Sequence, residues 1–190
     1  MSDAESGPDR RAVVLDMLPN GRPDDDRPAH RKSPLAFALG EADFRLTELT
    51  LAEDADIGFS DRVRLDSDGI ESTHEVDFSG LSSAARSELE YAVEATIDRE
   101  ERRFVDFYND AQPITLRLHQ LNLLPGIGKK LRNSILDERK RKPFESFEEL
   151  IERVAGLYKP KEILTERILE ELREEDLKYR IFVGHDPNGE

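Results

Sequence analysis

The sequence predicts an α+β protein, with a small β-barrel over about residues 10–80 and a helical region over about residues 81–178. Short apolar runs separated by turn residues fill the first part, as in small all-β barrels. The second part has apolar residues at helical spacing with charged residues between them. Residues 1–9 are small, polar and acidic, so we expect a disordered tail there, and a C-terminal strand and tail over residues 179–190.

Five short strands are expected in the barrel. The first, at 11–18, contains β-branched residues and ends at the turn signal Pro19-Asn20-Gly21. Prolines and an acidic triplet make residues 22–33 a loop. The other four strands are expected at 35–39, 44–51, 62–65 and 74–78.

The helical region begins with one long helix. Ser82 or Ser83 can cap its N-terminus, its apolar residues continue to Tyr108, and Pro113 marks its end or a kink. Four more helices are expected at 114–124, 128–140, 146–154 and 161–172.

The chain is strongly acidic, but its charged residues are unevenly distributed. Asp and Glu number 42 against 28 Lys and Arg, which gives a net charge of −14. Excess carboxylate with few lysines favours solubility in concentrated salt, so we interpret the chain as haloarchaeal, with an ordinary acidic protein as the alternative. Against this background residues 129–142 contain seven basic residues and only two acidic ones. A basic run of this kind is either a solvated helix face or a binding surface.

Other broad classes are excluded or left without support. The chain has no cysteine, which rules out disulfides and thiolate metal sites. It has no apolar run of membrane-spanning length and no signal-peptide pattern, so we expect a cytoplasmic protein with no membrane partner. The four histidines are scattered and no catalytic motif is present. We therefore expect no enzyme activity, no cofactor and no metal site.

The strongest candidate site is the turn between the second and third expected helices. Its two glycines allow a tight turn and a close approach of a ligand to the backbone, and the following helix would present unpaired amides to an anion. Two lysines stand directly behind the turn, which suggests a phosphate site; the alternative is an ordinary helix connection with a glycine cap. The predicted nucleic-acid-binding residues are Pro125, Gly126, Ile127, Gly128, Lys129, Lys130, Arg132, Arg139, Lys140, Arg141 and Lys142.

This turn resembles the helix-hairpin-helix module, whose hairpin commonly reads Leu-Pro-Gly-Ile-Gly followed by a basic or polar pair, as at residues 124–130. Residues 143–150, Pro-Phe-Glu-Ser-Phe-Glu-Glu-Leu, resemble the second half of the tandem form of the module. Arg132 departs from the pattern, because the module usually has a small alanine there. Either Arg132 points outward towards phosphate or the helices pack differently.

The chain as a whole resembles an uncharacterised archaeal family of predicted nucleic-acid-binding proteins. The resemblance covers about residues 10–184 and implies an OB-like N-terminal barrel followed by a helix-hairpin-helix region, with no defined reaction. A second nucleic-acid surface on the barrel loop would use Arg22, Arg27, Arg31 and Lys32, although a chain with 7% aromatic residues offers few stacking platforms. The matching segments are 18–25, 117–121, 124–130, 139–147 and 179–183.

The function that these observations favour is non-catalytic binding of RNA or DNA through the phosphate backbone, with little base specificity. The family resemblance favours RNA, in translation or ribosome-related work, with ribosomal or other nucleoprotein components as further partners. Two alternatives remain open. One is a protein-interaction scaffold within a nucleoprotein complex, and the other is a metal-dependent nuclease.

Overall fold

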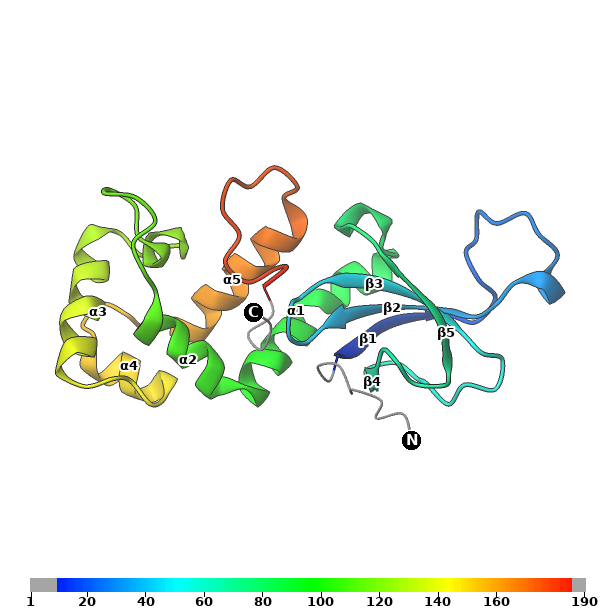
Figure 1. Ribbon diagram of the computed structural model, residues 1–190, viewed down its shortest axis with the longest axis horizontal. Helices are drawn as coiled ribbons and strands as arrows, with labels where there is room; N and C mark the ends of the chain where they lie inside the picture. The colour runs from blue at the N-terminus through cyan, green and yellow to red at the C-terminus, as the bar shows by residue number, and fades with distance from the viewer. Residues whose placement is uncertain (1–9, 186–190) are drawn as a thin grey trace, which may run out of the picture. The chain divides into compact units, whose positions relative to one another are not determined.

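A computed structural model describes residues 10–185 and has an α+β fold, as the sequence predicted. The expected disordered tail, 1–9, lies outside the described residues, as do residues 186–190. The chain divides into two compact units, the first comprising residues 10–92 with 172–185 and the second residues 93–171. This division falls within two helices, whereas the sequence suggested a boundary near residue 80. Figure 1 shows the order of the elements along the chain.

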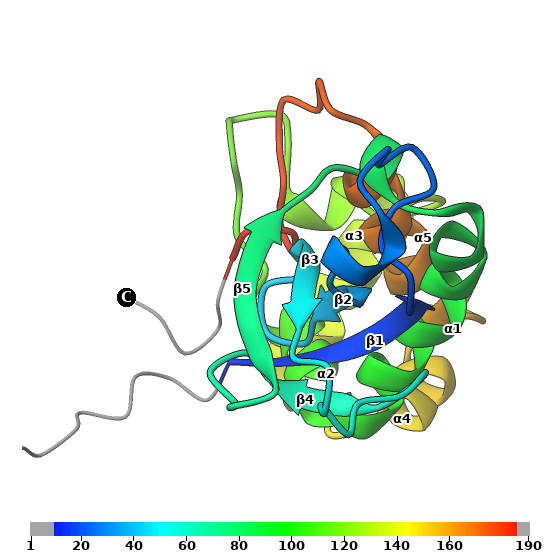
Figure 2. The same cartoon turned by 90° about the vertical axis from the view of Figure 1, so that its right-hand side faces the viewer.

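The first unit contains a five-stranded antiparallel sheet that curls into a half-barrel, with strand order β4-β1-β2-β3-β5. A bulge in β1 shifts the register between Val14 and Asp16 and leaves Leu15 unpaired, which bends the strand. Figure 2 shows β4 and β5 at the two edges of the curled sheet. The strands are β1 (Arg11–Leu18), β2 (Leu35–Gly40), β3 (Leu46–Leu51), β4 (Arg62–Arg64) and β5 (Ile70–Glu75).

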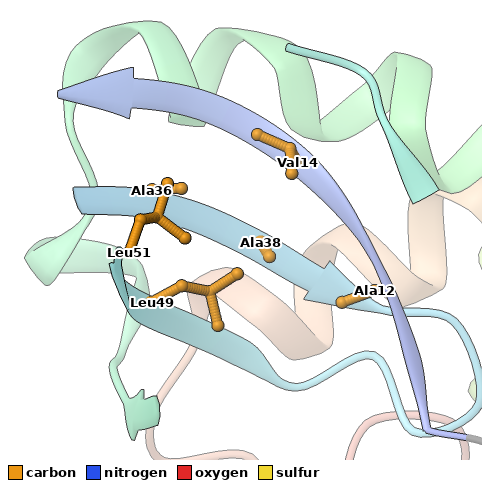
Figure 3. Close-up of a cluster of buried hydrophobic side chains, with 6 residues drawn as sticks. All are labelled: Ala12, Val14, Ala36, Ala38, Leu49 and Leu51. Carbon is orange, nitrogen blue, oxygen red and sulfur yellow. The ribbon is translucent and has the colours of Figure 1, made fainter. Parts of the chain in front are cut away.

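Both faces of the central strand β2 are buried. Alternate residues point to one face, where a small apolar core forms around Ala36, Ala38 and Leu49 (Figure 3). The other face carries Phe37 and Leu39, also buried. Ser82 Oγ, just before helix α1 (Ser83–Arg99), donates a hydrogen bond of 2.5 Å to Asp16 on β1. This bond ties the start of α1 to the sheet.

Two strands, β3 and β5, differ from the sequence-based bounds by two or more residues, and β2 and β4 by one. Phe44 has a left-handed backbone, with φ of +54°, and belongs to the β2–β3 turn, so β3 begins at Leu46. The fifth strand was predicted at 74–78, but β5 ends at Glu75 and residues 78–80 form a 3-10 turn that Asp77 caps. The shift went unrecognised because most residues of this edge strand are polar and exposed, with no apolar alternation to mark it.

The long helix predicted from Ser82 is interrupted. It consists of α1 and α2 (Glu101–Asp110), separated at Glu100, whose ψ of 41° is not helical. Neither glycine nor proline lies there, so the sequence carries no local signal for the break.

The helix predicted at 114–124 was wrong. Pro113 and His119 form an isolated antiparallel bridge, and only the short 3-10 helix η3 (Gln120–Leu123) follows. Side chains bind the amides that a helix would use: Thr115 Oγ1 accepts hydrogen bonds from the amides of Arg117 and Leu118. His119 caps η3 by accepting a hydrogen bond from Leu121 N at 3.1 Å.

The remaining helices match the sequence-based expectation to within a few residues. They are α3 (Lys129–Arg141), α4 (Phe147–Arg153) and α5 (Pro160–Arg173). None of the helices in the described part of the chain is long and apolar enough to cross a membrane.

The strand expected within 179–190 is absent from its described part, residues 179–185. Arg180 donates hydrogen bonds to the carbonyls of Glu174 and Glu175, which folds this segment back on itself. Phe182 is buried and Gly184 N bonds to Asp43 O at 2.8 Å. Side-chain hydrogen bonds, burial of Phe182 and a backbone hydrogen bond from Gly184 thus hold this segment.

Candidate functional site

The glycine turn before α3 has a backbone that only glycine adopts without strain. Gly126 has φ of +80°, and Ile127 N bonds back to Leu124 O at 3.2 Å to close the turn. Leu124 and Ile127 are buried, so they anchor the two ends while Gly126 and Gly128 face solvent. We call residues 124–127 turn 1. Because Ile127 N is used within turn 1, the amides that can meet a ligand begin at Gly128.

The N-terminus of α3 is open to such a ligand. Its first intrahelical bond runs from Arg132 N to Gly128 O, so the amides of Lys129, Lys130 and Leu131 precede the helical bonds. The cap residue Gly128 has no side chain with which to accept them. By contrast, Ser146 caps α4 by accepting a hydrogen bond from Glu149 N at 3.0 Å. Unpaired amides and the positive end of the helix dipole favour an anion at α3.

A second turn repeats this geometry before α5. Gly156 has φ of +92°, and Leu157 N bonds to Val154 O at 3.2 Å. We call residues 154–157 turn 2. Its ends, Val154 and Leu157, are buried, while Ala155 and Gly156 are exposed. Turn 2 therefore matches turn 1 in its left-handed glycine, its closing hydrogen bond and its two buried end residues.

The two turns line one cavity of about 600 Å³. The lining contains no Asp or Glu, although these residues number 42 in the chain. It contains Lys129 and Lys130, and a Cβ added at Gly126 or Gly128 would meet nothing within 4 Å. The cavity therefore suits a ligand that is anionic and that approaches the backbone closely. Its lining residues are Gly126, Gly128, Lys129, Lys130, Leu131, Ser134, Ala155 and Gly156.

Side chains from three elements fix turn 1. Asn122 Nδ2 donates to Ile127 O at 3.2 Å, and Arg132 donates to Asn122 Oδ1 at 3.0 Å. Arg167 of α5 donates to Leu123 O at 3.4 Å and forms a buried ion pair with Glu171 at 3.0 Å. Arg132, for which the sequence left two orientations open, thus bonds within the protein.

The structure separates the predicted basic residues into two groups. Lys129 and Lys130 lie in the first turn of α3, and Arg139 to Lys142 lie at its other end. A helix of this length is roughly 20 Å long, so one phosphate group cannot contact both. The Arg139 guanidinium donates to the carbonyls of Tyr108 and Ala111, at 3.2 and 2.9 Å, and burial lowers its pKa. Lys140, Arg141 and Lys142 are exposed.

The basic barrel loop is partly neutralised by carboxylates, one on strand β3 and one within the loop. Arg22 forms an ion pair with Glu48 and lies over the Phe37 ring. Arg27 binds both carboxylate oxygens of Asp25, and this hydrogen bonding lowers the pKa of Asp25 to about 2. Arg31 is exposed and Lys32 half-exposed. Of the four predicted residues, two are thus engaged with carboxylates.

Sequence reasoning missed Leu131, Ser134, Ala155 and Gly156 as cavity residues. A signal was present: Val154-Ala155-Gly156-Leu157 has the same apolar-x-Gly-apolar pattern as Leu124-Pro125-Gly126-Ile127. Among all the residues that the structure describes, no group of three or more His, Asp or Glu residues is arranged to hold a metal ion.

Comparison with known proteins identifies relatives along nearly the whole chain. A family model described as a protein of unknown function, DUF655, matches residues 8–184. The uncharacterized protein MJ0038 of Methanocaldococcus jannaschii is 39% identical over 177 residues, which cover 90% of this chain and 78% of that protein. The crystal structure of Af1531 from Archaeoglobus fulgidus is 40% identical and superposes with a TM-score of 0.82, covering 91% of this chain and 98% of that one.

Proposed function

The chain belongs to the archaeal DUF655 family, and from the geometry of its own residues we propose that it binds RNA or DNA through the phosphate backbone, without catalysis. The single observation that carries this proposal is the cavity shared by turns 1 and 2. Two backbone turns of the same geometry meet there beside two lysines, and no carboxylate lines it in a chain of net charge −14. Oriented amides and lysines are the groups that hold phosphate.

We propose that the second unit is a tandem helix-hairpin-helix module. Turn 1 followed by α3, and turn 2 followed by α5, are its two hairpins with their second helices. The first helix of the first hairpin is reduced to η3, because residues 113–119 form a loop instead. Each hairpin would contribute backbone contacts, which give affinity without reading bases.

For the first unit we propose an OB-like barrel. Strand β1 pairs with β2 and β4, and β3 pairs with β5, so β4 and β5 are the two edge strands. A pairing of β4 with β5 would close the sheet into a barrel. OB folds are partly open five-stranded barrels that bind single strands in basic grooves. Arg31 and Lys32, exposed or half-exposed on the barrel loop, are the residues that we propose for such a second surface.

We further propose RNA as the ligand, in translation or ribosome-related work, in a salt-rich haloarchaeal cell. The preference for RNA rests on the family resemblance of the sequence. The salt argument rests on the excess of acidic residues and on the type of contact. At molar salt the Debye length is about 3 Å, so long-range attraction fades. Hydrogen bonds from amides held in a fixed geometry retain more of their value.

Substitution of Gly128 tests the proposal. Its φ of −86° is open to any residue and a new Cβ would meet no protein atom, so Gly128→Val should fold normally. The valine side chain would enter the shared cavity and block approach of a phosphate to the α3 amides. We expect loss of RNA and DNA binding in gel-shift titrations at several KCl concentrations, including molar KCl.

Gly58→Val is the matched control. Gly58 lies in the first unit, and a new Cβ there would meet only Asp61 Oδ2 at 3.6 Å. This variant should bind as the unmodified chain does. A folded Gly128→Val protein with full affinity would show that the turns are structural. If the unmodified chain binds neither RNA nor DNA in moderate salt, the scaffold alternative is favoured, and metal-dependent cleavage of the substrate would favour a nuclease.

A further inference from the structure

Arg167 and Glu171 form an ion pair inside the second unit, on the buried face of α5. Their exposed fractions are 5% and 1%, and Arg167 Nε donates to Glu171 Oε2 at 3.0 Å. The two residues are one turn of helix apart, on the face where Leu164 and Ile168 are also buried. A charged pair in apolar surroundings loses hydration that the attraction between its members only partly replaces. Stability alone therefore does not explain why these positions are charged.

Arg167 offers a directed hydrogen bond to the segment before turn 1, which an apolar side chain could not. Its Nη1 donates to Leu123 O at 3.4 Å and to Glu170 Oε2 at 3.3 Å. Leu123 is the last residue of η3, and carbonyls at the end of a helix have no donor within that helix. The planar guanidinium serves a carboxylate and a carbonyl at once, because its N–H groups point in fixed directions. The ion pair with Glu171 thus sets the direction in which Arg167 donates to Leu123.

The helix that carries Arg167 follows directly on turn 2. Turn 2 ends at Leu157 and α5 starts at Pro160, whose carbonyl accepts a hydrogen bond of 2.7 Å from the buried Tyr108 hydroxyl. Arg167 lies two turns of helix further along, roughly 10 Å from Pro160. Turn 2, α5, Arg167 and Leu123 therefore form a continuous connection from one turn to the other.

A packing contact joins the two turns as well. A Cβ placed at Gly156 in turn 2 would lie 3.8 Å from Leu131 Cδ1 in the first turn of α3. Leu123 precedes turn 1 and Leu131 follows it, so the hydrogen bond and the packing contact act on the two ends of turn 1. Packing limits how closely the turns approach, whereas a hydrogen bond also fixes a direction.

We propose that Arg167 is a positioning residue, which holds turn 1 and turn 2 at the spacing at which one nucleic-acid ligand contacts both. This inference rests on the proposed function. Arg167 is not among the residues that line the shared cavity, so it acts through Leu123 and touches no phosphate itself. Donors that are held in place before the ligand arrives lose little entropy on binding. Loosening turn 1 should therefore lower the affinity at every salt concentration, although no group that contacts the ligand is removed.

The test removes the bond to Leu123 without leaving a buried charge unpaired. In the double variant Arg167→Met with Glu171→Leu, apolar side chains of similar volume replace both charges, so the melting temperature should stay near that of the unmodified chain or rise. Fluorescence anisotropy with short labelled RNA and DNA, each as a single strand and as a duplex, measures binding by the full chain. We expect the affinity to fall about tenfold while the slope of log affinity against log salt stays unchanged, because no phosphate contact is lost.

Glu171→Gln should have the opposite effect. Its amide oxygen still accepts a hydrogen bond from Arg167, which keeps its bond to Leu123, but the neutral partner no longer offsets the buried charge. This variant should melt at a lower temperature and, at temperatures where it is folded, bind with full affinity. If the pair had a structural role only, the affinity would follow the stability in both variants.

Arg62→Met with Glu41→Leu is the matched control, since Arg62 donates to the buried Glu41 at 2.9 Å in the first unit. It should bind as the unmodified chain does. Full affinity in the folded Arg167→Met, Glu171→Leu protein refutes the positioning role, and loss of binding by Gly128→Val in the same assay leaves the proposed function standing. A reduced salt slope would mean that Arg167 contacts phosphate, which also refutes the positioning role.

Arg167→Lys decides the matter if the double variant does not fold. It keeps a positive charge beside Glu171, but its compact ammonium does not reproduce the guanidinium fork, so it should bind more weakly. A folded Arg167→Lys protein with full affinity refutes the positioning role. If the unmodified chain binds none of the four nucleic acids, this inference and the proposed function are both refuted.

Discussion

The Arg132 guanidinium donates a hydrogen bond of 3.0 Å to Asn122 Oδ1, and Asn122 in turn donates to Ile127 O at 3.2 Å. This relay connects α3 to the turn that precedes it. A position at which the helix-hairpin-helix pattern usually has alanine is thus occupied here by a side chain that fixes the turn. Arg132 differs in this respect from its exposed neighbours Lys129 and Lys130.

The salt dependence of binding should separate these residues. Lys129→Ala and Lys130→Ala would remove the phosphate contacts that we propose, so each should reduce the slope of log affinity against log salt by about one. Arg132→Ala should leave the slope unchanged and lower the free energy of unfolding by about 1 kcal/mol, since its hydrogen bond is within the protein. Lys178→Ala, at an exposed lysine of the first unit, is the control for the loss of one charge. An equal slope change for Arg132→Ala would mean that it contacts phosphate.

Turn 2 should contribute to the same site. Ala155 is exposed in turn 2 and lines the cavity, so Ala155→Glu would place a carboxylate where we expect phosphate. We expect the affinity for nucleic acid to fall at least about tenfold at low salt, by repulsion at close range. Ala95→Glu, on an exposed face of α1, changes the net charge equally and should have little effect. Equal losses for the two variants would indicate a general charge effect and no role for turn 2.

Stability should depend on His119 between neutral and mildly acidic pH. Burial first, then Arg139 and Arg132, lower the pKa of His119 below its ordinary value of 6.5. As pH falls below about 6.5 the unfolded chain gains a proton that the folded chain does not, so stability falls until pH passes the lowered pKa. His119→Asn keeps a cap acceptor for Leu121 N and should remove this part of the pH dependence.

Thermal melting across this pH range measures the effect. His74→Asn, on exposed strand β5, is the control for loss of one histidine. If the melting temperature of His119→Asn followed that of the unmodified chain through the whole pH range, His119 would not be the source of this pH dependence.

We expect loss of the Arg139 side chain to lower the free energy of unfolding, because its hydrogen bonds lie within the protein. Its guanidinium bonds two backbone carbonyls at the end of α2, so Arg139→Gln should lower the free energy of unfolding by about 2 kcal/mol. Lys140→Ala, at an exposed position of the same helix, should change it by less than about 0.5 kcal/mol. Urea denaturation measures both, and equal stabilities would show that the Arg139 bonds contribute nothing.

Local patterns in the sequence determined much of the fold. The strand at Arg11–Leu18 and the helices α3, α4 and α5 follow from apolar spacing and from cap and turn residues. Turn 1 was recognised as a candidate site because two glycines precede two lysines. Such signals act over a few residues, so they can be read without the rest of the chain.

Tertiary structure decided what local patterns could not. Residues 114–124 have helical spacing, but Thr115, His119 and Asn122 bind the amides that a helix would use. The polar edge strand β5 exists because β3 offers it a partner, and its own sequence does not mark it. Above all, the meeting of turn 1 with turn 2 is a long-range contact. Packing brings Gly126 and Gly156 to one cavity, and the spacing of either turn by itself carries no information about the other.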